Sequence, residues 1–208
     1  LDEQKNIISI CNSYRSSISS AQNIINNYFP TINFDNYPIV PLGNLINSTE
    51  YGSSKKALDI GEIPVLRMGN IQGGEIDFDD LVYTNDAVEI KKLNLQNGDI
   101  LFNRTNSPKL VGKSAIFRNQ MKSIFAGYLI RIKVNKEKIL PEYLNLFLNS
   151  SEGKKLHNHY KSVSGNQANI NATKLREYKI PLPKLSEQQE IINEIKNEKD
   201  LIDVNRKS

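Results

Sequence analysis

The segment Asn103–Ser107 places two amides, one guanidinium and two hydroxyls in five consecutive residues. Such side chains can donate hydrogen bonds to phosphate oxygens. Amide and guanidinium groups can also form two hydrogen bonds at once with the edge of one base. A second polar set follows at Gln167, Asn169 and Asn171. Both segments therefore predict contact with nucleic acid. Because Asn and Ser also build turns, the alternative is that these residues shape the backbone, as we expect for Asp99.

The net charge of +4 is spread unevenly along the chain. Residues 50–99 carry ten acids and five bases, whereas residues 100–136 carry eight bases and no acid. Cations without intervening carboxylates can follow a phosphate backbone, although a solvated strand face would look the same. The eight bases are Arg104, Lys109, Lys113, Arg118, Lys122, Arg131, Lys133 and Lys136. The predicted DNA-contacting residues are Arg67, Asn70, Asn103, Arg104, Thr105, Asn106, Ser107, Lys113, Lys122, Gln167, Asn169 and Asn171.

Catalytic patterns are weak in this sequence. Gly112-Lys113-Ser114 resembles the end of a phosphate-binding loop, but Ser107 stands where that motif requires glycine. The sequence contains neither an Asp/Asn-Pro-Pro-aromatic tetrad nor a Gly-rich strand-to-helix turn. These two patterns would hold S-adenosylmethionine and a flipped adenine. We therefore expect no cofactor and no catalysis by this chain alone.

A metal site is also not expected. Asp79 or Asp80 with Glu89 and Lys91 has a spacing that some metal-dependent nucleases use, and a nuclease is retained as an alternative function. His157 and His159 lack the i, i+4 spacing of helical metal ligands, so we expect them on the surface or beside DNA. A lone cysteine, Cys11, cannot form an internal disulfide and is read as a small apolar side chain.

The elements that must position these residues can be read from periodicity. Short β-rich runs at 63–68, 99–102, 115–117 and 128–132 alternate with Gly-rich or Asn-rich turns. Residues 141–148 predict a helix that opens with proline and either continues to residue 160 or breaks near Gly153. The fold class is therefore α+β, with a β-rich recognition domain at 37–184.

Long helices are predicted on both sides of this domain, at 1–36 and 185–208. The first carries apolar residues at heptad spacing, and its opening is repeated 184 residues later, where 186–192 align with 2–8. The predicted helix-packing residues are Ile7, Cys11, Tyr14, Ile18, Ile25, Ile191, Ile195 and Ile202. Since no apolar run approaches the ~20 residues that span a bilayer, we expect a cytoplasmic protein without membrane contact.

The stretch Gly98–Ser107, followed by Val111-Gly112-Lys113, resembles the central motif of type I restriction-modification specificity subunits. Further resemblances lie at Ile63–Ile71, Gly165–Asn171, Leu175–Pro183, Leu185–Gln188 and, in the first helix, Asp2–Gln4. The resemblance implies a non-catalytic target recognition domain that reads one half of a bipartite site in double-stranded DNA. It also implies helices that act as a spacer and dock adenine methyltransferase subunits, with a restriction subunit as a further partner.

A full subunit of that family has two recognition domains, whereas this sequence has one. Three arrangements stay open: half of a two-domain subunit, a half-size subunit that forms a homodimer through its coiled-coil helices, or the tail of a fused methyltransferase polypeptide. A partner-binding protein scaffold is the second alternative function, beside the nuclease. The acid-free stretch argues against the scaffold, whereas metal-dependent cleavage by the isolated chain would establish the nuclease.

Overall fold

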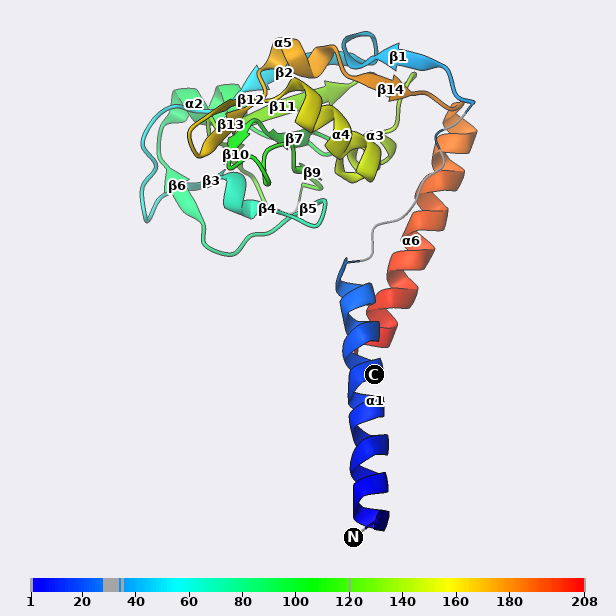
Figure 1. Cartoon of the computed structure of the whole chain (residues 1–208). Helices are drawn as coiled ribbons and strands as arrows, with labels where there is room; N and C mark the ends of the chain where they lie inside the picture. Colours follow the sequence, from blue (N-terminus) through cyan, green and yellow to red (C-terminus); the bar gives the residue numbers. More distant parts are fainter. Residues whose placement is uncertain (1, 28–33, 35, 120, 208) are drawn as a thin grey trace. The chain divides into compact units, whose positions relative to one another are not determined.

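The computed structural model describes residues 2–27, 34, 36–119 and 121–207, and the side chains of 7–19, 34, 36–119 and 121–200 (Figure 1). The chain divides into two compact units. Residues 32–192 form what we call the central unit, and residues 1–31 with 193–208 form the helical unit. The two units are described separately below.

Helices and strands alternate irregularly along the chain, as the α+β prediction requires. The helices are α1 (Asp2–Asn27), α2 (Ala87–Leu93), α3 (Pro141–Asn149), α4 (Ser151–Tyr160), α5 (Ala172–Arg176) and α6 (Leu185–Lys207), with single 3-10 turns η1 (Leu42–Asn44) and η2 (Met68–Asn70). The strands are β1 (Ile39–Pro41), β2 (Ile46–Tyr51), β3 (Ile63–Leu66), β4 (Ile71–Gln72), β5 (Glu75–Ile76), β6 (Val82–Thr84), β7 (Ile100–Asn103), β8 (Thr105–Asn106), β9 (Ser114–Ile116), β10 (Ile124–Phe125), β11 (Leu129–Val134), β12 (Ser162–Ser164), β13 (Gln167–Asn169) and β14 (Lys179–Pro181).

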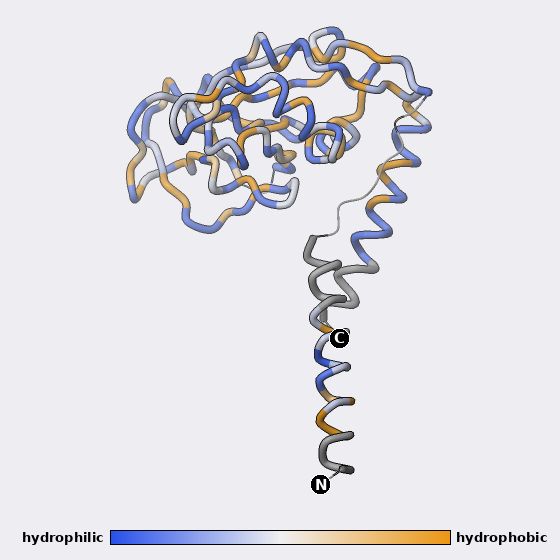
Figure 2. Tube along the Cα trace, viewed as in Figure 1, coloured by the Kyte–Doolittle hydropathy of each residue, from blue (hydrophilic) through white to orange (hydrophobic). Residues whose placement is uncertain are grey.

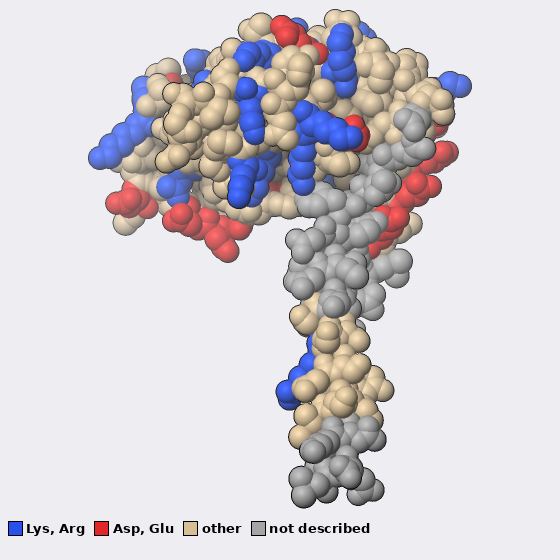
Figure 3. All heavy atoms as spheres, in the orientation of Figure 1, with Lys and Arg blue, Asp and Glu red and all other residues tan. Residues whose placement is uncertain are grey.

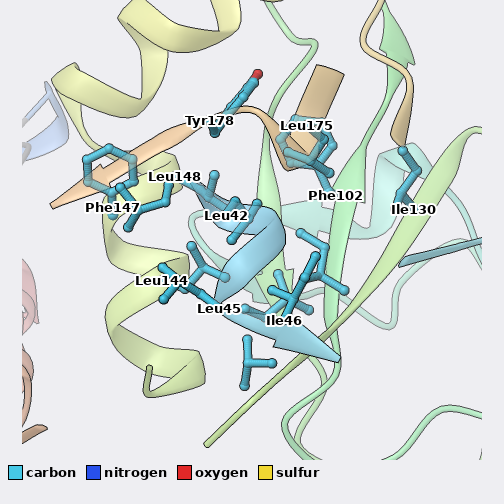
Figure 4. Packing of buried hydrophobic residues seen from close by; sticks show 14 of the residues in the cluster. Leu42, Leu45, Ile46, Phe102, Ile130, Leu144, Phe147, Leu148, Leu175 and Tyr178 are labelled. Carbon is cyan, nitrogen blue, oxygen red and sulfur yellow. The ribbon is translucent and has the colours of Figure 1, made fainter. Parts of the chain in front are cut away.

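A six-stranded sheet in the order β2-β11-β7-β9-β5-β4 organises the central unit, and three smaller sheets surround it. Successive side chains of a strand point to opposite faces, so β7 contributes to two apolar clusters. Phe102 packs in the cluster that includes α3, and Leu101 packs in the other. Figure 4 shows the first cluster, where Leu144 and Leu148 of α3 lie against Leu42. The core therefore lies on both faces of the sheet.

The predicted elements are found close to their expected positions. The four β-rich runs correspond to β3, β7, β9 and β11, and the predicted helix is α3. This helix ends at Asn149, because the Ser150 hydroxyl accepts a hydrogen bond from the Gly153 N–H and begins α4 instead. The α+β fold class is confirmed. Strands β2, β12 and β13 were not foreseen, since their residues are too polar or too few to show a clear alternation.

The first turns of α6 are fixed to the central unit by hydrogen bonds and by apolar packing. Gln188 is fully buried. Its Oε1 accepts from the Leu140 N–H at 2.8 Å, and its Nε2 donates to the carbonyls of Lys138 and Pro183. Ile191 packs beside the core of the central unit. The division between the two compact units falls inside α6, after Ile192.

The helical unit combines α1 with the last part of α6. The predicted seam of α1 is uncovered in this chain, with Ile7, Tyr14 and Ile18 each more than half exposed and Cys11 exposed as well. By contrast, Ile195 is buried. The remaining seam residues, Ile25 and Ile202, lie outside the described side chains. Figure 2 shows hydrophobic residues on the described part of α1. Among the described residues, no helix has both the length and the hydropathy to span a bilayer.

Candidate nucleic-acid interface

The two polar segments of the sequence meet in one sheet of the central unit. Strand β8 pairs antiparallel with β13, with Asn106 opposite Ala168 and Thr105 opposite Asn169. The Asn169 amide Nδ2 donates to the Thr105 hydroxyl at 2.6 Å. Strand β12 completes the sheet on the other side of β13. Segments more than 60 residues apart in sequence therefore form a single polar surface.

The same pairing joins two stretches without carboxylates. Residues 153–176 contain no acid, a signal that sequence analysis missed, and they carry Lys154, Lys155, Lys161, Lys174 and Arg176. Lys161 Nζ donates to the Pro108 carbonyl just after β8, and Lys174 Nζ donates to the Ser162 hydroxyl of β12. Figure 3 shows Lys and Arg gathered on the face that carries α4 and the β12–β13 hairpin. Two cationic segments thus flank the three-stranded sheet.

The side chain of Arg104 is held in place by Gly127 and by Tyr51 of β2. Its Nη1 donates to the Gly127 carbonyl at 3.0 Å, and its Cζ lies 4.8 Å from the centroid of the Tyr51 ring. The Tyr51 hydroxyl in turn accepts from the Ala172 N–H, just beyond β13. Cation–π and hydrogen-bond contacts therefore fix the guanidinium before any ligand arrives. Arg104 is only half-buried, so it can still present part of the group to solvent.

Two of the predicted contact residues are buried. Asn70 is buried, and its amide Oδ1 accepts from the Arg67 N–H while Nδ2 donates to the carbonyls of Asp77 and Asp79. Asn103 is fully buried in the centre of the main sheet. A buried side chain cannot meet a base edge in this conformation. We therefore correct the predicted contact set by removing both residues.

The other predicted residues keep at least partial exposure, but they do not all lie at the sheet. Asn106 accepts from the Ser107 N–H, and Asn171 caps α5 by accepting from the Lys174 N–H, so both amides also shape the backbone. Arg67 pairs with Asp80, and Lys113 Nζ donates to Gln72 near η2. Lys122 is exposed, and it precedes Ser123, whose carbonyl accepts a hydrogen bond from the Leu95 N–H.

The acid-free stretch 100–136 is therefore not one cationic surface. Arg131 is 3% exposed in the middle of β11, where it pairs with Glu50 and Asp99 and donates to the Asn94 carbonyl. Arg118 pairs with Glu75 and Glu142. The prediction that Arg131 contacts phosphate is wrong, because its guanidinium is buried and paired with carboxylates of the protein itself. The acidic partners of both arginines lie outside residues 100–136, so a charge count along the sequence did not reveal these ion pairs.

The match to known proteins decides the family. The model for the type I restriction modification DNA specificity domain matches residues 34–207, which is most of the chain. The chain belongs to this specificity-domain family. It is 37% identical to the type I restriction enzyme MjaX specificity subunit of Methanocaldococcus jannaschii over 131 residues, covering 62% of this chain and 31% of that protein. It is 29% identical to the EcoKI specificity subunit of Escherichia coli over 137 residues, covering 64% of this chain and 29% of that protein.

The fold of this specificity-domain chain is also that of a solved family structure. The HsdS subunit of Thermoanaerobacter tengcongensis superposes with a TM-score of 0.60 at 13% identity, covering 96% of this chain and 48% of that subunit. The chain spans about a third of the length of the two curated relatives and about half of the solved subunit. The shared architecture therefore concerns one part of those longer proteins.

The glycine of the specificity-domain motif Val111-Gly112-Lys113 has a packing role. Gly112 has a φ of 96°, a left-handed conformation that strains other residues, and a Cβ built there would lie 2.3 Å from a ring carbon of His157. His157 itself is 5% exposed. Its Nε2 donates to the Leu148 carbonyl and its Nδ1 accepts from the Tyr178 hydroxyl. The expectation of a surface position is wrong for His157, because α4 turns this ring into the core.

Burial lowers the pKa of His157 to about 4, with the nearby cations Lys154 and Lys161 acting in the same direction. The ring is therefore neutral at pH 7.

Asp99 behaves as expected for a turn residue, since its Oδ2 accepts from the Gln96 N–H, and burial raises its pKa. Within the described part of the chain, no three His, Cys, Asp or Glu side chains are grouped as metal ligands. The nuclease alternative gains no support from this structure.

Proposed function

We propose that this chain is a sequence-specific DNA-recognition module of a type I restriction-modification system, without catalytic activity of its own. In this proposal it reads one half of a bipartite site in double-stranded DNA, within the cytoplasm. The observation that carries the proposal is the pairing of β8 with β13. It unites two acid-free segments and their polar side chains in one sheet of a specificity-domain fold.

The proposed contacts fall into two kinds. Uncharged groups and Arg104 at the sheet face the bases, and the lysines around it meet phosphates. Lys113 and Lys122 stay in the proposal as phosphate contacts outside the sheet, because both are at least partly exposed. The full set is Arg67, Arg104, Thr105, Asn106, Ser107, Lys109, Lys113, Lys122, Lys161, Gln167, Asn169, Lys174 and Asn171.

Methylome sequencing of the host with and without the gene tests this function. A bipartite adenine-methylated motif should vanish with the gene, because the methyltransferase would lose its only guide to that site. The purified chain alone should transfer no labelled methyl group to DNA. Methylation by the chain alone, or an unchanged methylome, would contradict the proposal.

Salt dependence tests the phosphate contacts directly. Changing Lys109 or Lys122 to Ala should weaken binding to all duplex sequences. Each change should also reduce the slope of log affinity against log salt by about one unit, since each lost phosphate contact releases one fewer counterion. Lys55→Ala is the matched control, because Lys55 is also exposed but pairs with Asp86 within the acid-rich segment 50–99. Equal slopes for all three variants would place the DNA on another surface.

We further propose that α1 and α6 form the coiled-coil spacer and bind methyltransferase subunits or a second copy of this chain. The exposed apolar seam of α1 supports this role. Changing Ile18 to Asp should reduce the size of the assembly formed by the chain, alone or co-expressed with its methyltransferase, in analytical ultracentrifugation. Ser16→Asp, also exposed but off the seam, should leave the size unchanged. Assemblies of the same size in both variants would remove the seam from the interface.

A further inference from the structure

One face of the β12-β13-β8 sheet is made entirely of uncharged polar side chains. Directly paired residues of antiparallel strands share a face, and Ser162 pairs with Asn169, which pairs with Thr105. Ser164 pairs with Gln167, two residues from Asn169 and therefore on the same side. We call this set the polar sheet face: Thr105, Ser162, Ser164, Gln167 and Asn169. Each of its side chains can both donate and accept hydrogen bonds.

The two faces of this sheet are differently placed. Ala168, on the opposite face, is 1% exposed and belongs to the main apolar cluster, so it anchors the middle of β13 in the core. Ser162, Ser164 and Gln167 are exposed, and Thr105 and Asn169 are half-buried. A rigid sheet thus presents adaptable hydrogen-bonding groups outward, while its other side fixes their positions.

The hairpin between β12 and β13 is shaped for close approach to a ligand. Ser164 and Gln167 close a two-residue turn, and Gly165 at its first position has a φ of 55° that suits such a tight connection. Residues 162–167 are all exposed, and no heavy atom lies within 4 Å of a Cβ built on Gly165. The tip therefore projects from the unit with only two strands and short side chains.

Charge around the hairpin indicates what it approaches. Lys161 precedes β12, Lys174 bonds Ser162, and Lys109 is exposed just after β8. No carboxylate occurs between residues 153 and 176. A cationic border around a neutral hydrogen-bonding centre complements duplex DNA, whose phosphates border grooves lined by base edges.

We propose that the polar sheet face is the base-reading surface and that the β12–β13 hairpin enters the major groove as a two-stranded ribbon. The proposal rests on the proposed function and specifies the element, the groove and the residues. The major groove is about 12 Å wide and admits a two-stranded ribbon, whose strands lie about 5 Å apart. Ser164 and Gln167 are nearest the tip and read bases. Asn106 and Asn171 also shape the backbone beside the sheet, through the bonds that they accept from the Ser107 and Lys174 N–H groups.

The test selects preferred sequences from a pool of duplexes with a randomised segment, using the full chain. Gln167→Ala should lower affinity for the preferred duplex about tenfold or more and flatten preference at one position, while binding to unrelated duplex stays the same. Ser164→Ala should show a smaller loss at a neighbouring position. Val163→Thr is the matched control, since Val163 is exposed on the same strand but on the opposite face. Equal melting temperatures would show that all variants fold.

Substituted duplexes identify the groove. Replacing purines of the preferred duplex by 7-deazapurines removes a major-groove acceptor and should weaken binding by the native chain, but not further by Gln167→Ala at the position that it reads. Unchanged preference in both variants, with a reduced salt slope in Lys109→Ala, would overturn the hairpin proposal and leave the proposed function standing. Absence of any duplex binding by the native chain would overturn both.

Discussion

Replacing Arg131 with Met should lower the free energy of unfolding by about 3–5 kcal/mol. The side chain of Arg131 is 4% exposed and that of Asp99 is 7% exposed, so the substitution leaves a buried carboxylate without its cation. It also removes the bond to the Asn94 carbonyl and the contact with the Phe125 ring. Chemical denaturation of the native chain and the variant measures the difference.

The matched control is Arg118→Met, which removes an arginine from the same acid-free stretch. Arg118 pairs with Glu75 at the surface, where an ion pair contributes roughly 0–1 kcal/mol. Adding Asp99→Asn to the Arg131→Met variant should recover part of the lost stability, because the uncompensated charge disappears. Losses of the same size for Arg131→Met and Arg118→Met would show that the buried pair contributes no more than a surface one.

The contrast between these two arginines shows where sequence reasoning reaches its limit. The β-rich run at 128–132 correctly predicted β11, since that signal is local. The fate of Arg131 depends on Glu50, which pairs opposite it from β2, a strand that the sequence did not reveal. Charge counted along the chain therefore overstated the cations available to DNA.

The candidate interface shows the complementary case. Residue types predicted the two polar segments, but only the register of β8 against β13 brings Thr105 beside Asn169. Strands this short carry no periodicity that could reveal their pairing. The lack of acids in residues 153–176 was visible in the sequence, yet it gained meaning only when that segment was found next to the first acid-free stretch. Burial of Asn103 likewise depends on a distant strand, since this residue pairs opposite Leu129 of β11.

Acidification should destabilise the central unit through His157. The neutral ring donates to the Leu148 carbonyl and accepts from the Tyr178 hydroxyl, and burial lowers its pKa to about 4 from an ordinary value of 6.5. Between these two pH values the unfolded chain binds the proton and the folded chain does not. Stability is therefore complete above pH 6.5 and falls as the pH drops toward 4, by about 3 kcal/mol for this group.

His157→Gln isolates this contribution from that of the carboxylates. The variant should be less stable at pH 7, because Gln fills the site beside Gly112 and Phe102 less well than the ring that packs there now. Its unfolding free energy should nevertheless fall less steeply than that of the native chain between pH 6.5 and 4, since it has no imidazole to protonate. Denaturation midpoints at half-unit pH steps measure both curves. Parallel curves across that window would show that His157 titrates alike in the folded and unfolded states, against the hydrogen-bonded, buried geometry that requires them to differ.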